Sequence, residues 1–311
     1  MNAPNPDPNP PRFALAIEAQ CLRLPKPGRL RCEDVAGGVD RTWWLMDGAT
    51  GVIAPDNPCD SGWFAETIQA AFLAQLARAP QTSLDELIRC ALDAAQTQFA
   101  QLAPQAIRAH PPWWPSSTLV LVRIEPAPTA SAAACATLDA RLLGDSELAV
   151  VGLDGQVRRL RDDRHTQFCA GFYGPVLDAL RAGAGYDSPR FQNALAAAVT
   201  HERAHRNQAD SYAILSPEAW SGAPECDGLT ARLPLYPGDR IVLLSDGAAR
   251  GFAVFGLASA DASLRDLATG NLWAQLQAIR AAEHADPQGQ AFPRGTCHDD
   301  ATVLRLTPQT A

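Results

Sequence analysis

Short apolar runs that end at an aspartate recur along this 311-residue chain. Aliphatic and β-branched runs of this length are typical of buried strands. The three clearest runs are residues 42–46, 241–244 and 301–306, and the aspartates beside them are Asp47, Asp246 and Asp299. Each aspartate lies where an apolar strand meets a loop. We therefore predict that these three carboxylates, far apart in sequence, belong to one site.

The remaining pattern predicts helices and further strands without a regular strand–helix–strand alternation. Apolar residues at helical spacing predict helices over 62–78, 83–102, 174–183, 189–205 and 261–284. Ser83 and Glu86 form a capping-box signal at the start of the second helix. Asp154-Gly155, between two β-type runs, predicts a tight hairpin. Strands are expected over 13–22, 42–47, 117–124, 211–215 and 240–245, and residues 104–115 read as a surface loop. This order favours an α+β fold, with antiparallel sheets covered by helices.

Composition narrows the classes of protein. The formal charge is −8 and no run is rich in Lys or Arg, which disfavours binding to nucleic acid or to an anionic membrane surface. The eight cysteines include no C-x-x-C pair, so zinc-ribbon and thioredoxin-like sites have no support. They are scattered along a chain with no predicted export signal, which favours reduced thiols and a cytoplasmic location. The Pro/Asn-rich residues 1–11 are expected to be a disordered tail, and residues 12–308 a single domain. No apolar run is long enough to predict a membrane span.

Carboxylates brought together repel one another unless a cation neutralises them. Hard oxygen ligands of this kind suit Mg²⁺ or Mn²⁺. Two of the three aspartates are followed by glycine, whose backbone can approach a metal closely enough to offer its carbonyl. An isolated Asp-Gly after a strand is also an ordinary turn signal, so the metal hypothesis depends on the three sites together.

Six segments, in order, resemble the metal-dependent type 2C (PPM) serine/threonine protein phosphatases, especially their bacterial branch. They span residues 29 to 303, nearly the whole chain. The segments are Arg29 to Asp34 for R-x-x-x-E-D, Trp44 to Gly48 for the strand ending in D-G, Ser117-Thr118 for S-T, Gly144 to Ser146 for G-D-S, Leu243 to Gly247 for L-x-S-D-G, and Asp299 to Val303 for D-[ND]-x-T-V.

The resemblance implies an αββα sandwich, in which two antiparallel sheets pack face to face between helices. It also implies two Mn²⁺ or Mg²⁺ ions, with a weaker third ion in some members. The implied metal ligands are Glu33, Asp47, Gly48, Asp246 and Asp299, with Asp145 at the third ion. Asp47 would bridge the two metals, Asp34 would orient metal-bound water, and Arg29 would hold the substrate phosphate. Arg29, Asp34 and Asp47 are thus the implied catalytic residues.

The implied activity is hydrolysis of phosphoserine and phosphothreonine in proteins by attack of a metal-bridging hydroxide, reversing a serine/threonine kinase in bacterial signalling. The chain departs from the family pattern in several places, among them the Gly-Gly after Asp-Gly, which is reduced to Gly51, and residues 250–298, which are poor in recognisable substrate-flap features. Ala49 stands where eukaryotic members have a His, and Cys32 replaces an Asn before Glu33. A catalytically weak or inactive member that binds phosphoproteins as a regulator is the alternative.

A second motif points to different chemistry. Residues 201–205, His-Glu-Arg-Ala-His, fit the H-E-x-x-H signature of zinc metalloproteases. Arg203 and Arg206 favour instead a solvated helix end, where basic side chains complement the helix dipole. No third zinc ligand follows at short spacing, so we expect an ordinary surface helix here.

Overall fold

Ten strands form two five-stranded antiparallel sheets in the computed structural model, which describes residues 15–49, 57–127, 134–218 and 228–310. One sheet has the order β1-β10-β9-β6-β7 and the other β2-β3-β4-β5-β8. The strands are β1 (Leu15–Leu24), β2 (Val35–Val39), β3 (Thr42–Met46), β4 (Leu119–Pro126), β5 (Ala136–Leu143), β6 (Glu147–Val151), β7 (Val157–Arg161), β8 (Leu229–Leu235), β9 (Arg240–Leu244) and β10 (Ala301–Thr310). The tail expected over residues 1–11 lies outside the described residues.

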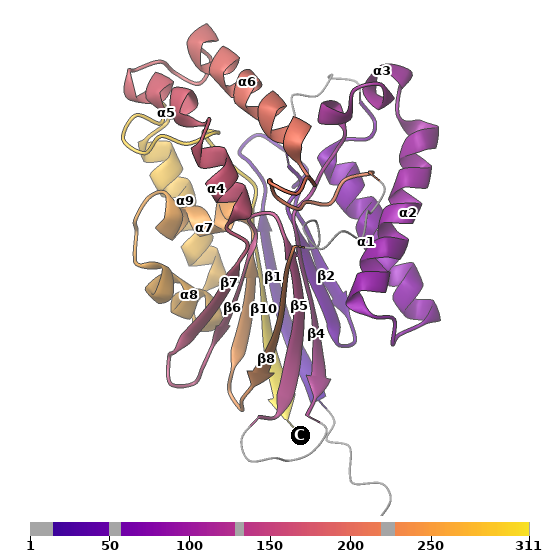
Figure 1. Ribbon diagram of the computed structural model, residues 1–311. Coiled ribbons are helices and arrows are strands. Elements are labelled where there is room, and N and C mark those ends of the chain that lie inside the picture. The colour runs from indigo at the N-terminus through magenta and orange to yellow at the C-terminus, as the bar shows by residue number, and fades with distance from the viewer. Residues whose placement is uncertain (1–14, 50–56, 128–133, 219–227, 311) are drawn as a thin grey trace, which may run out of the picture.

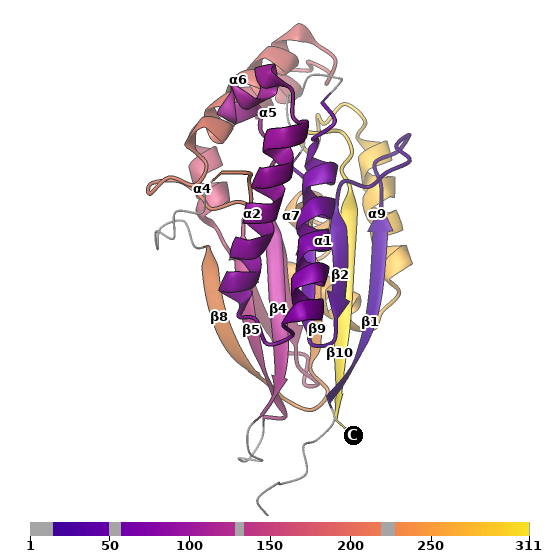
Figure 2. The same cartoon turned by 90° about the vertical axis from the view of Figure 1, so that its right-hand side faces the viewer.

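Helices cover both outer faces of the paired sheets (Figure 1). Helices α1 (Ser61–Arg78) and α2 (Leu84–Leu102) pack on one side, and α7 (Asp246–Ala253), α8 (Ala260–Thr269) and α9 (Leu272–Ala285) on the other. Figure 2 shows α1 and α2 side by side along the sheet. The predicted αββα sandwich is therefore confirmed.

The centre of the sandwich is apolar because alternate residues of the two sheets face one another. This core includes Leu45, Val120, Leu138, Leu243 and Leu304, all at most 1% exposed. Separate apolar clusters join each sheet to its helices. The site described below lies where several of these strands end, so the packed core fixes the positions of its backbone.

A helical lobe lies over one end of the sheets, at the top of Figure 1. It consists of α4 (Arg164–Ala170), α5 (Gly174–Arg181) and α6 (Pro189–His205), which follow β7 in the chain. The lobe has its own small core, with Val176 and Phe191 almost fully buried.

Local sequence signals predicted most elements correctly. The Ser83 hydroxyl accepts a hydrogen bond from the Glu86 amide at 3.2 Å and caps α2. Gly155 has a φ of +81° in the β6–β7 hairpin, as the Asp-Gly signal requires. The helix predicted over 261–284 is instead two helices, because the chain breaks at Gly270 and Asn271 caps α9.

Two other predictions were inaccurate, and one helix was missed. Residues 211–215 form an isolated bridge between Leu215 and Ser117 rather than a strand. The expected loop over 104–115 contains the short helices α3 (Gln105–Arg108) and η1 (Pro111–Trp113). Helix α4 was not predicted at all. Across the described ranges, no helix is long and apolar enough to cross a membrane.

Candidate metal centre

The six motifs converge at one end of the sandwich. Asp47 directly follows β3, and Asp246 is the first residue of α7, just after β9. Asp299 immediately precedes Asp300 and β10. The Ser245 amide donates to the Thr302 carbonyl at 3.1 Å, and the Thr302 amide donates to the Ser245 hydroxyl at 3.0 Å. These two bonds hold the second and third of the segments together. The structure thus brings the three strand-end aspartates close together.

Hydroxyl groups from two motifs fix Asp47. The Asp47 amide donates to the Thr118 hydroxyl at 3.0 Å, and the Ser117 hydroxyl donates to the Asp47 carbonyl at 2.9 Å. Thr118 also shares a 2.6 Å hydrogen bond with Ser146, in the G-D-S segment. These side chains are buried, so the S-T and G-D-S motifs act here as backbone supports for Asp47.

The glycines after the aspartates are required by close packing. A Cβ atom on Gly48 would lie 2.8 Å from the Glu33 carbonyl oxygen. A Cβ atom on Gly247 would lie 1.8 Å from the Asp300 carbonyl oxygen. Each Asp-Gly pair therefore lets a second acidic segment lie directly against the first.

Asp300 organises the loop that carries Glu33. Its two carboxylate oxygens accept hydrogen bonds from the backbone amides of Lys26, at 2.7 Å, and Glu33, at 2.9 Å. Asp300 is 3% exposed, so this link is shielded from water. The second aspartate of the D-[ND] motif thereby joins the start of β10 to the loop between β1 and β2.

The carboxylates repel one another in this setting. Burial, followed by the charges of neighbouring carboxylates, raises the pKa of Asp34 to about 7 and that of Asp246 to about 6. Burial and the same neighbours also raise the pKa of Asp47 well above its ordinary value. These carboxyl groups therefore keep their protons to higher pH than ordinary aspartates do, as expected where negative charges are crowded together.

Two basic side chains offset part of this charge. The Lys26 ammonium lies 3.2 Å from Asp299 Oδ1 and 3.9 Å from Glu33 Oε2, and the Arg250 guanidinium pairs with Asp299. Although burial opposes it, the cations Arg250 and Lys26 lower the pKa of Asp299. Lys26 and Arg250 were not identified from the sequence, because neither lies in a motif and only the fold brings them here.

The donor set fits divalent cations. Within the described part of the chain, both carboxylate oxygens of buried Asp34 lack a hydrogen-bond partner, which is costly unless a cation or water meets them. Asp47, Asp246 and Asp299 keep partial solvent access, as ligands of an exchangeable ion require. Clustered carboxylate oxygens are the donors that Mg²⁺ and Mn²⁺ prefer.

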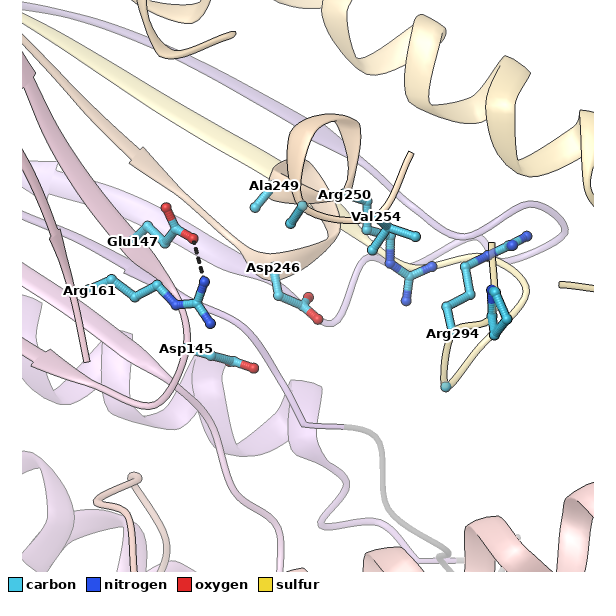
Figure 3. A pocket seen from close by; sticks show the side chains of 11 residues that line it. Asp145, Glu147, Arg161, Asp246, Ala249, Arg250, Val254 and Arg294 are labelled. Atoms are coloured by element: carbon cyan, nitrogen blue, oxygen red, sulfur yellow. Dashed lines mark ion pairs between the residues drawn. The ribbon is translucent and has the colours of Figure 1, made fainter. Parts of the chain in front are cut away.

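Asp145 lies at the edge of the cluster and has a second partner. Its side chain and that of Asp246 point into a cavity of about 250 Å³, which Arg161, Arg250 and Arg294 also line (Figure 3). Asp145 Oδ2 lies 3.0 Å from His165 Nδ1. Although burial opposes it, this contact lowers the pKa of Asp145.

Arg29 lies in the loop between β1 and β2, and its side chain is exposed. Its backbone amide donates to the Lys26 carbonyl at 3.0 Å. The guanidinium is therefore accessible to a ligand, and Glu33 lies four residues further along the same loop.

The expectation of a solvated end for α6 was wrong. Arg203 is 6% exposed and donates to the backbone carbonyls of Ala49, at 2.8 Å, and Trp114, at 3.3 Å. Arg206 is 3% exposed and pairs with Glu218 at 2.7 Å. Carbonyl and carboxylate oxygens thus replace water around the two guanidinium groups.

The side chains of the H-E-x-x-H segment do not point to a common position where a zinc ion could bind. The His201 and His205 rings contact each other, with centroids 4.3 Å apart, and both contact Phe168. Glu202 contacts His165 instead, at 2.9 Å. The metal-capable grouping around Glu202, among the described residues, contains neither histidine of the motif. The geometry therefore gives no support to the protease hypothesis.

Comparison with known proteins gives a result at the level of the fold. No protein-family model and no curated protein matches the chain. The catalytic domain of the serine/threonine protein phosphatase PstP in complex with two manganese ions is 15% identical, with a TM-score of 0.51, and the match covers 95% of this chain and 99% of that one.

Two further solved structures are equally similar. The S. agalactiae serine/threonine phosphatase is 16% identical with a TM-score of 0.52, and the match covers 94% of this chain and 99% of that one. The photosystem II phosphatase PBCP is 15% identical with a TM-score of 0.51, over 95% of this chain and 100% of that one. The chain therefore has the fold of the PPM-type serine/threonine phosphatases, the family that its six sequence motifs resemble.

Proposed function

We propose that this protein is a Mn²⁺- or Mg²⁺-dependent phosphatase that hydrolyses phosphoserine and phosphothreonine in proteins. The observation that carries the proposal is the carboxylate cluster. Asp34, Asp47, Asp246 and Asp299 come from different parts of the chain, yet each perturbs the pKa of another member of the group. Such repulsion destabilises a packed core. In a divalent-cation site, the bound ion offsets it.

The proposed metal ligands are Glu33, Asp47, the Gly48 carbonyl, Asp246 and Asp299, with Asp145 beside a weaker third ion. Two bound ions would supply Lewis-acid stabilisation of the phosphoryl oxygens and a water nucleophile of lowered pKa. Asp47 lies centrally, since its pKa responds to Asp34, Asp246 and Asp299 alike. Asp34, whose carboxylate oxygens are buried, would orient a water molecule by accepting a hydrogen bond from it.

Substrate binding is assigned to Arg29. A planar guanidinium can donate two parallel hydrogen bonds to a phosphate, and this one is exposed beside the cluster's Glu33 loop. At the position after Asp-Gly, the Ala49 carbonyl accepts hydrogen bonds from Arg203 and from the Ser61 hydroxyl. Residue 49 thus has a structural role here and offers no side-chain acid.

The biological setting is proposed from the same resemblance. Residues 12–308 would act as one catalytic domain in the cytoplasm of a bacterium, on protein targets of a serine/threonine kinase. The fold alone leaves the substrate protein open, because one fold can serve several functions.

The test is hydrolysis of p-nitrophenyl phosphate and of a phosphothreonine peptide with Mn²⁺, Mg²⁺ or EDTA. Asp47→Asn should lower kcat/KM by more than about 100-fold, since even outer residues of metal sites change activity by 10–100-fold. Asp178→Asn is the matched control, because Asp178 is exposed on α5 and pairs only with its neighbour Arg181 among the described contacts.

Turnover that survives EDTA or Asp47→Asn would contradict the proposal. Mn²⁺ binding measured by calorimetry, without turnover of either substrate, would support instead the alternative of an inactive member that binds phosphoproteins.

A further inference from the structure

A second cluster of metal-binding side chains lies in the helical lobe, apart from the carboxylate centre. His165 and Cys169 are one turn apart on α4, and Glu202 faces them from α6. His165 Nε2 lies 2.9 Å from Glu202 Oε1 and 3.4 Å from Cys169 Sγ. One donor atom from each residue therefore points to a common position.

The surroundings orient these donors. Asp145 Oδ2 lies 3.0 Å from His165 Nδ1, so the other ring nitrogen, Nε2, faces Cys169 and Glu202. The Tyr173 hydroxyl donates to Glu202 Oε2 at 3.2 Å, which leaves Oε1 directed at the cluster. A carboxylate on the far nitrogen of a histidine, and a hydrogen bond on the far oxygen of a carboxylate, are the usual supports of metal ligands.

Electrostatics favours a cation at this point. Two carboxylates, Asp145 and Glu202, and one thiol surround a single imidazole ring. A metal ion at this position would offset the negative charge of the two carboxylates and would displace the protons of its nitrogen and sulfur ligands.

We propose that His165 Nε2, Cys169 Sγ and Glu202 Oε1 bind a transition-metal ion, with Zn²⁺ the favoured occupant. Nitrogen, thiolate and carboxylate donors suit zinc, whereas the oxygen-only carboxylate centre suits Mn²⁺ or Mg²⁺. Tetrahedral Zn²⁺ with bonds of about 2.0–2.3 Å separates its ligand atoms by about 3.3–3.7 Å. The separations from His165 Nε2 to Glu202 Oε1, 2.9 Å, and to Cys169 Sγ, 3.4 Å, would widen by only a few tenths of an ångström, and Sγ and Oε1 lie within 4.8 Å of each other.

Three protein ligands leave a fourth position for water or another ligand. The His165 and Glu202 side chains are 20% and 16% exposed, so an ion can enter from solvent. The bound ion would fix α4 to α6 and, through His165, to Asp145 at the catalytic cavity. Of the H-E-x-x-H segment, Glu202 alone would then bind the metal ion. This inference does not depend on the proposed phosphatase activity.

The first test uses Co²⁺ as a spectroscopic substitute for Zn²⁺. The full chain is stripped with EDTA, supplied with excess Mn²⁺ to fill the carboxylate centre, and titrated with Co²⁺. We expect a thiolate-to-cobalt charge-transfer band that saturates near one equivalent and is abolished by added Zn²⁺, since zinc forms colourless complexes. Cys169→Ser should remove at least nine-tenths of this band.

The matched control is Cys32→Ser, because Cys32, Asp34 and Asp300 form the other metal-capable grouping among the described residues. This variant should keep the band. A band that survives Cys169→Ser, disappears in Cys32→Ser, or never forms would overturn the proposal.

A second measurement needs no variant, and so remains decisive if Cys169→Ser does not fold. The wild-type chain is alkylated with iodoacetamide, with and without Zn²⁺, and modification of each cysteine is followed by mass spectrometry. Zn²⁺ should slow alkylation of Cys169 at least tenfold. Cys90, half-buried on α2 and hydrogen-bonded to Glu86, serves as the internal control and should react at an unchanged rate. Equal rates for Cys169 with and without Zn²⁺ would refute the site.

Discussion

The repulsion among the carboxylates predicts how the stability of the metal-free protein depends on pH. Asp246 has a pKa of about 6 in the folded protein, against an ordinary value of 3.8. The folded state therefore binds more protons than the unfolded state between pH 4 and pH 6. The stabilisation that comes from protonated Asp246 is fully present below pH 3.8 and is lost as the pH rises through 6.

The size of the effect follows from the shift. Two pKa units correspond to on the order of 3 kcal/mol for Asp246 alone, at about 1.4 kcal/mol per unit. Asp34, with a pKa of about 7, contributes with the same sign. The pKa of Asp299 is lowered, so its ionised form stabilises the folded protein and this stabilisation is lost only in stronger acid. Asp299 therefore does not oppose the loss of stability expected as the pH rises from 4.5.

The assay is urea unfolding in EDTA at pH 4.5, 5.5 and 6.5, compared with the same series in Mn²⁺. The range stops at 6.5 because the raised pKa of His165 adds its own loss of stability at higher pH. Wild-type protein in EDTA should lose stability across the series. Mn²⁺ binds the ionised carboxylates, so its stabilising effect should grow with pH.

Asp246→Asn removes the titrating group. At pH 6.5 in EDTA, this variant should be more stable than wild type by on the order of 3 kcal/mol and should gain much less from Mn²⁺. Asp178→Asn, the same change on the surface of α5, should behave as wild type. A wild-type free energy of unfolding that rises between pH 4.5 and 6.5 in EDTA, or an Asp246→Asn protein less stable than wild type at pH 6.5, would refute the reasoning.

Two further predictions concern the same centre. Lys26→Met removes the ammonium 3.2 Å from Asp299, which competes with a metal for the same negative charge, so the Kd for Mn²⁺ measured by calorimetry should fall about tenfold, equivalent to 1.4 kcal/mol. An unchanged or higher Kd would contradict this role. Gly247→Ala places a Cβ atom 1.8 Å from the Asp300 carbonyl oxygen and should cost about 3 kcal/mol of unfolding free energy in urea. Gly174→Ala, with nothing within 4 Å of the added atom, should change it by less than about 0.5 kcal/mol. Equal losses in the two alanine variants would show that the close approach at Gly247 is not what requires glycine.

The parts of the fold that sequence predicted correctly are those set by local rules. Apolar runs predicted the strands, Ser83 predicted the start of α2, and Asp154-Gly155 predicted the β6–β7 hairpin. The three strand-end aspartates were predicted as one site for the same reason, since an acid at the end of a buried strand is a local anomaly. Such signals need no knowledge of which strands pair.

Other features depend on partners that are distant in sequence. Asp300 binds the backbone of Lys26 and Glu33 across more than 260 residues, and no local pattern encodes that contact. Arg203 was misread because a charged residue on a helix normally faces water. In this protein Arg203 donates to the Ala49 carbonyl instead. That contact depends on a loop that packs against the helix only in the folded chain.

The distribution of charge shows how the same cluster can fold without metal and still bind it. Lys26 and Arg250 neutralise Asp299 from one side, which limits the repulsion that the metal-free chain must tolerate. The pKa values of Asp47 and Asp246 remain raised despite these two cations, so part of the repulsion among the carboxylates is not neutralised. A third internal cation would stabilise the metal-free fold but would occupy the position that a divalent ion needs. The affinity of the centre for metal is therefore set by how much negative charge the fold leaves without a basic partner.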